Sequence, residues 1–558
     1  MATDNKPLTK RSVVSSFIFK YDNGKPLVAL FRRSDKVNTY QHHLAPISGS
    51  IDKEDATPLA AAWRELHEET TLTPSSLALL RQGKPFFFAD LSAGREWTVH
   101  PFAFLLLAGE DAIHTDWEHE GWGWHDPLEV EDSDQFGGVP RLAESLRRVW
   151  VERDLGGDAG GVLAAGLERL RGDYQSGARE LAGDALRILR DVIAKLDTRG
   201  TSEAWWARVR FAAWHVWKNG RESMGAAIMS VLLSALRSIE DTLKEHGIRP
   251  DSEVSTACKD TVLEALGRQI AAREKASSRL VSQALAAYLE ANFSSRLASQ
   301  EPISILTLSE SSTISHSLRH LVVESGFSLD LRVLESRPLF EGVSLAGSFA
   351  DDLVSARASL QGQGGAERTR KVSITLYSDA AAVLASRGVD VVLIGADRIA
   401  STGAVSNKTG SLPAILSARH VTGGRGAPAK VIVLGESDKV APPGSPEEHV
   451  VEENDPAQLV RAWNADYNSS RVRKGAQVIA KLLKERETRT ETETENPEEG
   501  GPDSSDGVEV AVRNIFFEWC PGELIDIYMT EFGQWTAKDI AAHSEHLGAE
   551  QERLFSDL

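Results

Sequence analysis

The chain has 558 residues, which suggests about three or four domains, and its 41 % hydrophobic and 26 % charged residues are typical of soluble globular proteins. Its 62 Lys and Arg against 81 Asp and Glu give a net charge of −19, which argues against general binding to nucleic acids or anionic membranes. No stretch approaches the roughly 20 apolar residues that span a bilayer, and only two cysteines occur, so we expect a cytoplasmic protein.

Strands and one capped helix are predicted in the N-terminal part of the chain. Apolar runs predict strands at 13–19, 27–31 and 97–107. Between them, Thr57 is a suitable N-cap, and Pro58 takes the first helical position, where its missing N–H costs nothing.

Residues 64–70 of this helix read Arg-Glu-Leu-His-Glu-Glu-Thr. Glu65, Glu68 and Glu69 stand at i, i+3 and i+4, so the three carboxylates share one helix face and repel one another. A hard divalent cation turns that repulsion into binding, because Mg²⁺ prefers oxygen ligands and joins carboxylates to phosphates. A solvated acidic face is the alternative, but the strand, loop, helix and strand context favours a metal site.

Residues 10–150 resemble a Nudix hydrolase domain, whose motif contains Arg-Glu-hydrophobic-x-Glu-Glu. The resemblance implies an α/β/α sandwich that holds Mg²⁺ or Mn²⁺ and hydrolyses a nucleoside diphosphate linked to another moiety. Glu68 and Glu69 would then be metal ligands, Glu65 a ligand or general base, and Arg64 would orient the glutamates. A bound metal would neutralise phosphate charge and lower the pKa of a bound water.

The motif is degenerate outside this core. The family Gly falls on Ser50, the early Glu on Ala56 and the closing Gly on Thr71, a β-branched residue poorly suited to a left-handed cap. Glu118 and Glu120 are candidates for an extra metal ligand. Three nearby acidic residues are candidates to replace the lost carboxylate: Asp52, Glu54 and Asp55.

The periodicity changes twice after the first domain. A glycine-rich segment, 156–161, predicts a flexible break, and the pattern is helical from 162 to about 293. From Ile303, short apolar runs alternate with helical patterns, which predicts a parallel sheet wound with helices. Residues 485–507 are acidic and almost free of apolar side chains, so we expect a disordered insertion. The predicted strands are Ile303–Leu308, Leu329–Leu334, Val372–Leu376, Val391–Ile394 and Val431–Leu434.

Polar residues follow these strands, at the edge where open α/β sheets bind ligands. Such residues are common without function, but their joint appearance favours a site for a phosphorylated polyol. Ser311 and Asp379 are therefore candidate ligand-binding residues. The strand-end groups are Ser309, Ser311 and Ser312, then Glu335–Arg337, then Ser378 and Asp379, and then Gly395, Asp397 and Arg398.

The second part of the chain resembles one superfamily over roughly 165–545. It contains the alpha, beta and delta subunits of translation initiation factor 2B, ribose-1,5-bisphosphate isomerase and methylthioribose-1-phosphate isomerase. The resemblance implies a helical domain at 162–297, a Rossmann-like doubly wound domain at 298–545, and a homodimer formed through the latter. The motifs are ESRPLFEG (335–342), YSDAA (377–381), GADRI (395–399), SNKTGS (406–411) and NIFFEWCPGELIDIYMTEFG (514–533).

The resemblance also implies roles for single residues. Arg337 corresponds to a phosphate-binding Arg, Asp397 to the acid/base Asp of the isomerases, and Asn407 with Lys408 to a ligand-binding pair. Arg221 is aligned loosely with a basic phosphate contact at the start of the helical domain.

Ser309 stands where the isomerases carry a catalytic Cys. A serine hydroxyl is a far poorer proton donor or acceptor near neutral pH than a thiol, so the substitution argues against isomerisation while leaving the pocket.

Three functions stay open on the sequence. The favoured one is a metal-dependent Nudix hydrolase fused to a domain that binds sugar phosphates or nucleotides. The second is a non-catalytic relative of the initiation factor 2B regulatory subunits, alpha type, with initiation-factor-like protein partners. The third is an isomerase resembling ribose-1,5-bisphosphate isomerase that uses Asp397 with Ser309 or a water.

Overall fold

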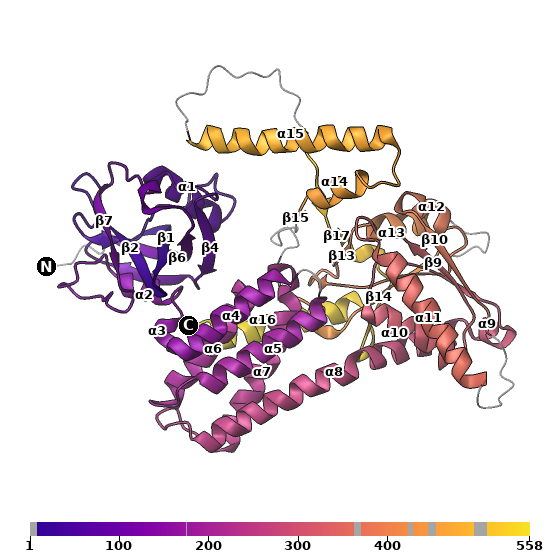
Figure 1. Cartoon of the computed structure of the whole chain (residues 1–558). Helices are drawn as coiled ribbons and strands as arrows, with labels where there is room; N and C mark the ends of the chain where they lie inside the picture. Colours follow the sequence, from indigo (N-terminus) through magenta and orange to yellow (C-terminus); the bar gives the residue numbers. More distant parts are fainter. Residues whose placement is uncertain (1–7, 174–175, 362–369, 422–427, 445–452, 496–509) are drawn as a thin grey trace.

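The computed structural model describes residues 8–173, 176–361, 370–421, 428–444, 453–495 and 510–558. An N-terminal sheet domain is followed by a helical region and a second sheet region (Figure 1). This mixed architecture confirms the α/β fold class that the sequence predicts.

The N-terminal domain is a seven-stranded sheet with helices on its faces. Its elements are β1 Thr9–Asp22, β2 Lys25–Arg33, β3 Leu44–Ala45, α1 Pro58–Thr70, β4 Leu77–Gln82, β5 Phe86–Asp90, β6 Arg95–Leu106, β7 His119–His125 and α2 Leu142–Arg147. The order is β3-β2-β1-β6-β4, with β5 also paired to β6 and β7 to β2. Val14 and Ile18 of β1 pack with α1, whereas Phe17 and Phe19 pack with α2. Alternate side chains of β1 therefore point to opposite faces of the sheet and pack in the cores on both sides.

A helical domain follows. Its helices are α3 Glu152–Leu155, α4 Gly157–Gly172, α5 Ala178–Lys195, α6 Ser202–Asn219, α7 Gly225–Glu245, α8 Thr256–Asn292 and α9 Ser294–Ser299. The flexible break expected at 156–161 is wrong, because α4 begins at Gly157. Gly160 lies so close to α3 that an added Cβ would be 2.7 Å from Cγ of Glu152, so tight packing outweighs the weak helix propensity of glycine. In the part of the chain that the structure describes, no helix is both long and apolar enough to cross a membrane.

The second sheet has the order β10-β9-β8-β11-β14-β18-β19, and only its last pair is antiparallel. Val391 and Leu393 of β11 pack in the core that contains α10 and α11, whereas Val392 and Ile394 pack in the core that contains α12 and α13. The sheet is therefore doubly wound, as predicted. The elements are β8 Ile303–Leu308, α10 Ser312–Val323, β9 Leu329–Leu334, α11 Glu341–Gln361, β10 Val372–Tyr377, α12 Ala382–Ala385, β11 Val391–Ile394, β12 Arg398–Ile399, β13 Val405–Lys408, α13 Ser411–His420, β14 Lys430–Leu434, β15 Glu453–Asn454, β16 Asn514–Ile515, β17 Phe517–Cys520, β18 Ile527–Thr530 and β19 Gly533–Trp535.

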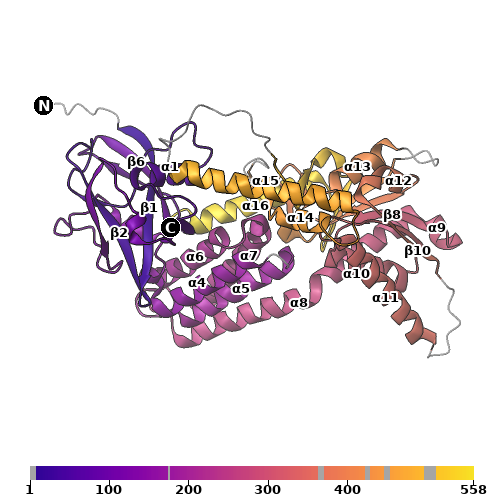
Figure 2. The same cartoon turned by 45° about the horizontal axis from the view of Figure 1, so that its top comes forward.

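Two further helices, α14 Ala457–Trp463 and α15 Ser470–Glu495, precede β16. Figure 2 shows α15 as one long helix. The short helix α14 packs against α15. The disordered insertion predicted at 485–507 is wrong for 485–495, which continue α15, because Glu and Arg are good helix formers. Residues 496–507 lie outside the described residues.

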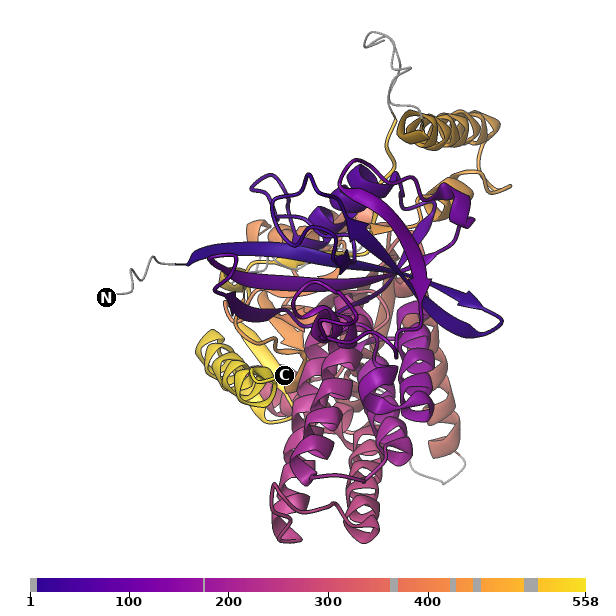
Figure 3. The ribbon, with the colours of Figure 1, turned by 90° about the vertical axis from the view of Figure 1, so that its left-hand side faces the viewer.

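The N-terminal domain lies against the helical domain (Figure 3), and its edge strand β4 contacts α6. The Asn219 side chain, at the end of α6, accepts a hydrogen bond from the Gln82 N–H at 2.7 Å and donates one to the Gln82 carbonyl at 2.9 Å. The amide thereby pairs with β4 as a neighbouring strand would. Arg171 of α4 also donates to the Leu80 carbonyl at 3.0 Å.

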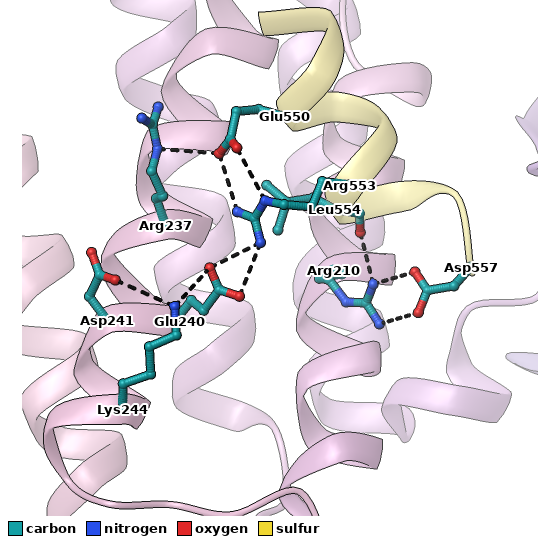
Figure 4. A network of polar contacts seen from close by, with 9 residues as sticks. All are labelled: Arg210, Arg237, Glu240, Asp241, Lys244, Glu550, Arg553, Leu554 and Asp557. Carbon is teal, nitrogen blue, oxygen red and sulfur yellow. Dashed lines mark hydrogen bonds and ion pairs between the residues drawn. The ribbon is translucent and has the colours of Figure 1, made fainter. Parts of the chain in front are cut away.

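The last helix, α16 Ala537–Phe555, packs on α6 and α7 through ion pairs (Figure 4). Arg553 bonds both oxygens of Glu240, at 3.0 and 3.1 Å, and is also paired with Glu550. Arg210 of α6 is buried and forms a two-pronged pair with Asp557, which lowers the pKa of that carboxyl. Arg210 also donates to the Leu554 carbonyl at 2.9 Å, so one buried guanidinium contacts both the last turn of α16 and the residues after it.

Candidate functional site

The helix α1 begins and ends as its sequence suggests, with one strained position. The Thr57 hydroxyl accepts a hydrogen bond from the Ala60 N–H at 3.1 Å, and Pro58 occupies the first turn. Thr71 takes the left-handed cap position at φ 60° although it is β-branched, and its N–H bonds the His67 carbonyl. The cap geometry of the motif is therefore kept without its glycine, at a cost in backbone strain.

Arg64 is the centre of the Nudix-like motif. Its guanidinium holds Asp55 by two bonds, at 3.2 and 2.9 Å, and bonds Glu65 at 2.8 Å, Glu68 at 3.1 Å and the Ser50 carbonyl at 2.9 Å. The bonds from Arg64 lower the pKa of Asp55. Of the three candidates for the lost carboxylate, Asp55 is the one that pairs most closely with the motif arginine.

Glu65 lies in a tight, desolvated position beside Gly49. A Cβ on Gly49 would be 2.0 Å from Cδ of Glu65, so any larger residue there would displace the Glu65 carboxyl. Burial raises the pKa of Glu65 to about 7, and the bond from Arg64 opposes this rise. A carboxyl that titrates near neutral pH is suited to proton transfer.

Glu69 is turned into the protein interior. It is 3 % exposed, and its Oε2 lies 2.6 Å from Nε2 of His119, the buried first residue of β7. Burial, and then the nearby charge of Glu118, raise its pKa.

The three glutamates predicted as metal ligands do not all have the same hydrogen-bond partner. Glu65 and Glu68 share Arg64, and Glu69 bonds His119. Among the residues that the structure describes, no group of three or more His, Cys, Asp or Glu side chains is arranged to hold a metal ion. The carboxylate oxygens are of the donor type that a hard cation prefers.

A cavity of about 400 Å³ lies beside the motif, and sequence reasoning missed most of it. Tyr40 donates to Asp90 at 2.6 Å and accepts from the Trp97 indole at 3.1 Å, while Arg95 lies 5.1 Å from the Trp97 ring centre. The wall combines aromatic rings, cations and the glycine that contacts Glu65. These residues include Arg11, Arg33, Lys36, Tyr40, Gly49, Phe88, Arg95, Trp97 and Arg141.

A second cavity, of about 570 Å³, opens at the carboxyl ends of the strands in the second sheet. It brings together six of the residues predicted from sequence: Arg221, Ser309, Ser311, Asp397, Asn407 and Lys408. It also contains residues that the sequence analysis did not single out: Arg179, His316, Glu341 and Lys439. Arg179 and Arg221 come from the helical domain, so both parts of the second half build the cavity.

A hydrogen bond fixes Asn407 on β13, and an ion pair with a cation–π contact fixes Lys408. Asn407 is 6 % exposed and donates to the Ser411 hydroxyl at 2.8 Å. The Lys408 ammonium lies 3.1 Å from Glu341 and 4.7 Å from the Phe516 ring centre. The cation is therefore held inside the cavity by a carboxylate and an aromatic face.

Asp397 lies in an environment that favours its neutral form. Burial raises its pKa, and the Glu341 charge adds to this rise. The cations Lys439, Lys408 and Arg221 act in the opposite direction. Because burial raises its pKa, the Asp397 carboxyl is a candidate proton donor.

Two of the predicted ligand residues do not line the second cavity. Asp379 accepts hydrogen bonds from the N–H groups of Ser336 and Arg337, both at 2.8 Å, and so holds the loop after β9. The Arg337 side chain is 55 % exposed and bonds Glu335 at 2.8 Å. Their roles in ligand binding stay predictions.

Comparison with known proteins assigns the larger part of the chain. A model of the Initiation factor 2 subunit family matches residues 175–537. The chain belongs to this family. A NUDIX domain model matches residues 10–149, so a NUDIX domain precedes the family domain, as the sequence resemblances predict.

The methylthioribose-1-phosphate isomerase of Symbiobacterium thermophilum is 30 % identical over 149 residues, which are 26 % of this chain and 35 % of that protein. The match thus spans about a third of this relative.

Solved structures of family members are similar at lower identity. The translation initiation factor eIF-2B of Pyrococcus horikoshii OT3 is 16 % identical, with a TM-score of 0.41 over 67 % of this chain and 96 % of that one. The eIF2B beta of Chaetomium thermophilum is 14 % identical, with a TM-score of 0.43 over 73 % and 97 %. The 5-methylthioribose 1-phosphate isomerase of Pyrococcus horikoshii OT3 is 16 % identical, with a TM-score of 0.40 over 72 % and 88 %.

Proposed function

We propose that the family domain binds a phosphorylated sugar or a nucleotide in the cavity of about 570 Å³. The observation that carries this proposal is the set of four cationic side chains in one cavity with a carboxyl suited to hydroxyl groups. Those cations are Arg179, Arg221, Lys408 and Lys439, and the carboxyl is Asp397.

Calorimetry on the full chain tests this proposal, with ribose 1,5-bisphosphate, ribose 5-phosphate and AMP as probes. We expect at least one probe to bind, and Lys408→Gln to weaken it by about tenfold or more, since a charge-assisted phosphate contact contributes about 1.5–3 kcal/mol. Lys430→Gln is the matched control, because Lys430 has an exposed side chain at the start of β14. Absence of binding by every probe, or equal loss in both variants, would remove the proposal.

The second proposed function is hydrolysis of a nucleoside diphosphate-linked substrate by the NUDIX domain. The observation in its favour is Glu65, whose carboxyl has a pKa of about 7 and is positioned by Arg64 and Gly49. Glu68, which shares Arg64 with Glu65, would help to hold Mg²⁺ or Mn²⁺, which when bound neutralises phosphate charge and activates water, and Glu65 would be the general base. The cations Arg11 and Arg33 in the adjacent cavity would bind the diphosphate.

Hydrolysis is measured on the full chain with a panel of nucleotide sugars, dinucleotides and capped nucleotides in the presence of Mg²⁺. We expect release of a nucleoside monophosphate and a loss of about 10²-fold or more in Glu65→Gln, the contribution typical of a general base. Glu96→Gln, at an exposed ion pair with Lys10 on β6 and β1, is the control. Turnover that is absent for the whole panel, or equal in both variants, contradicts the proposal.

We also propose a homodimer formed through the second sheet. Its edge strand β10 and the helices α12 and α13 carry large apolar side chains that are 47–53 % exposed: Leu376, Val383, Leu384 and Leu416. Analytical ultracentrifugation should give a dimer mass that Leu384→Asp reduces, and a monomer at every concentration would refute this.

A further inference from the structure

A further cavity, of about 290 Å³, lies where the NUDIX domain meets the family domain, and neither proposed function uses it. The helix α6 contacts both β4 and α16, so these elements touch one another around the cavity. A ligand in this junction cavity would therefore contact the NUDIX domain and the family domain at once. Its wall includes Gln82, the last residue of β4, Lys218 near the end of α6, Arg398 of β12 and Gln551 of α16.

The junction cavity contains two cationic side chains, Lys218 and Arg398. Within the part of the chain that the structure describes, neither side chain forms an ion pair or a hydrogen bond. The Lys218 ammonium instead lies 3.9 Å from the Trp217 ring centre. Burial lowers the pKa of both side chains, and the charge of Arg398 lowers the pKa of Lys218 further. The two cations therefore repel each other in a partly desolvated site, and a bound anion would relieve that repulsion.

The other polar groups of the junction cavity also favour an anion. Glu222 is the one carboxylate among the described lining residues, and its side chain is exposed, so two cations face a single negative charge. The Trp217 indole and the Gln551 amide line the cavity as well, and neither side chain has a hydrogen-bond partner among the described residues. The net charge of −19 does not prevent anion binding here, because charges farther away than about 8 Å are largely screened at physiological salt.

The chemistry of the two cations and the size of the cavity favour a small phosphate compound. A guanidinium binds two phosphate oxygens at once and an ammonium adds a compact positive charge, so the two together suit a dianion. Pockets for drug-sized ligands measure about 300–1,000 Å³, and the junction cavity lies just below this range. It therefore has room for one phosphate group with one small moiety attached.

We propose that the junction cavity binds a small phosphate-bearing anion, either free phosphate or a phosphate monoester, and that the bound anion stabilises the contact between the NUDIX domain and the family domain. Among the described residues, this cavity shares no lining residue with the cavity of about 570 Å³. Its occupancy therefore does not depend on either proposed function.

Hydrogen exchange followed by mass spectrometry tests the proposal on the full chain. The probes are inorganic phosphate, ribose 5-phosphate and AMP, and ribose is the uncharged control. With a probe at about 100 times its Kd, peptides that contain Gln82 or Lys218 should exchange about 100-fold more slowly, because a ligand that binds only the closed form slows opening by a factor of about 1 + [L]/Kd. Protection by inorganic phosphate alone would assign the site to the free ion, and stronger protection by an ester would assign it to a monoester.

Single variants show whether the protection comes from this cavity. Arg398→Gln and Lys218→Gln should each weaken binding by about tenfold or more, the usual contribution of a charge-assisted contact. The second variant keeps the test valid if the first fails to fold. Lys244→Gln is the matched control, because its side chain is 67 % exposed near the end of α7. Lys408→Gln should also keep the protection, because Lys408 lines the other cavity.

Four results would overturn the proposal. They are no protection by any phosphate probe, protection by ribose, equal protection in wild type and in both cavity variants, and loss of protection in Lys408→Gln, which would place the bound anion in the cavity of about 570 Å³.

Discussion

The contact of Asn219 with β4 gives the sharpest prediction about how the two halves of the chain are held together. Asn219 is 7 % exposed, and its amide makes both backbone hydrogen bonds of Gln82 across the domain boundary. It also lies 3.0 Å from Nδ1 of the buried His215. Asn219→Ala removes all of these bonds at once.

The cost follows from the number of groups left unpaired. Each lost hydrogen bond contributes about 1 kcal/mol, so the two backbone bonds give about 2 kcal/mol. Where water cannot reach the Gln82 N–H and carbonyl, their unpaired state raises the cost toward about 4 kcal/mol. Hydrogen exchange at the Gln82 amide should accelerate by about 30-fold or more, the factor that corresponds to about 2 kcal/mol.

Gln82→Ala is the matched control for this prediction. It removes only the side-chain bond to the Lys218 carbonyl, at 2.8 Å, and keeps the backbone pairing with Asn219. Its cost should stay below about 1 kcal/mol, because that bond is exposed. The reasoning is refuted if both variants lower the free energy of unfolding equally, or if the Gln82 amide exchanges no faster in Asn219→Ala.

Three further predictions concern the NUDIX domain, each measured by equilibrium unfolding. Thr71→Gly should stabilise the chain by about 1 kcal/mol, because glycine accepts φ 60° without strain. Gly49→Ala should destabilise it by about 1–3 kcal/mol and abolish any hydrolysis, since the methyl group displaces Glu65. Folding raises the Glu65 pKa from 4.5 to about 7, so protonation favours the folded state: this stabilisation is complete below pH 4.5 and is lost as pH rises through about 7. Wild type should lose about 3 kcal/mol over this window from this group, and Glu65→Gln should remove that slope.

Each of these has a clear contrary result. If Thr71→Gly is less stable than wild type, the threonine side chain contributes more stability than the strain at its left-handed backbone removes. A stable, fully active Gly49→Ala would mean that Glu65 is not confined by the loop. An unchanged pH slope in Glu65→Gln would place the proton uptake on another group.

Local sequence determined much of the fold and part of the candidate sites. The helix α1 was predictable because its start depends on Thr57 and Pro58, which lie within its own first turn. The strands of the second sheet were predictable because buried parallel strands need continuous apolar runs. Predicted site residues such as Asn407 and Lys408 line one cavity, because the ends of parallel strands lie at the same edge of the sheet.

Tertiary structure decided the pairings. Three contacts join segments whose sequence spacing gives no sign that they meet. They are Arg64 with Asp55, Glu69 with His119, and Glu341 with Ser309. A glycine-rich segment became helix because a neighbouring helix packs against it. Propensity and motif act over a few residues, whereas desolvation and close packing depend on which distant side chains arrive at the same point.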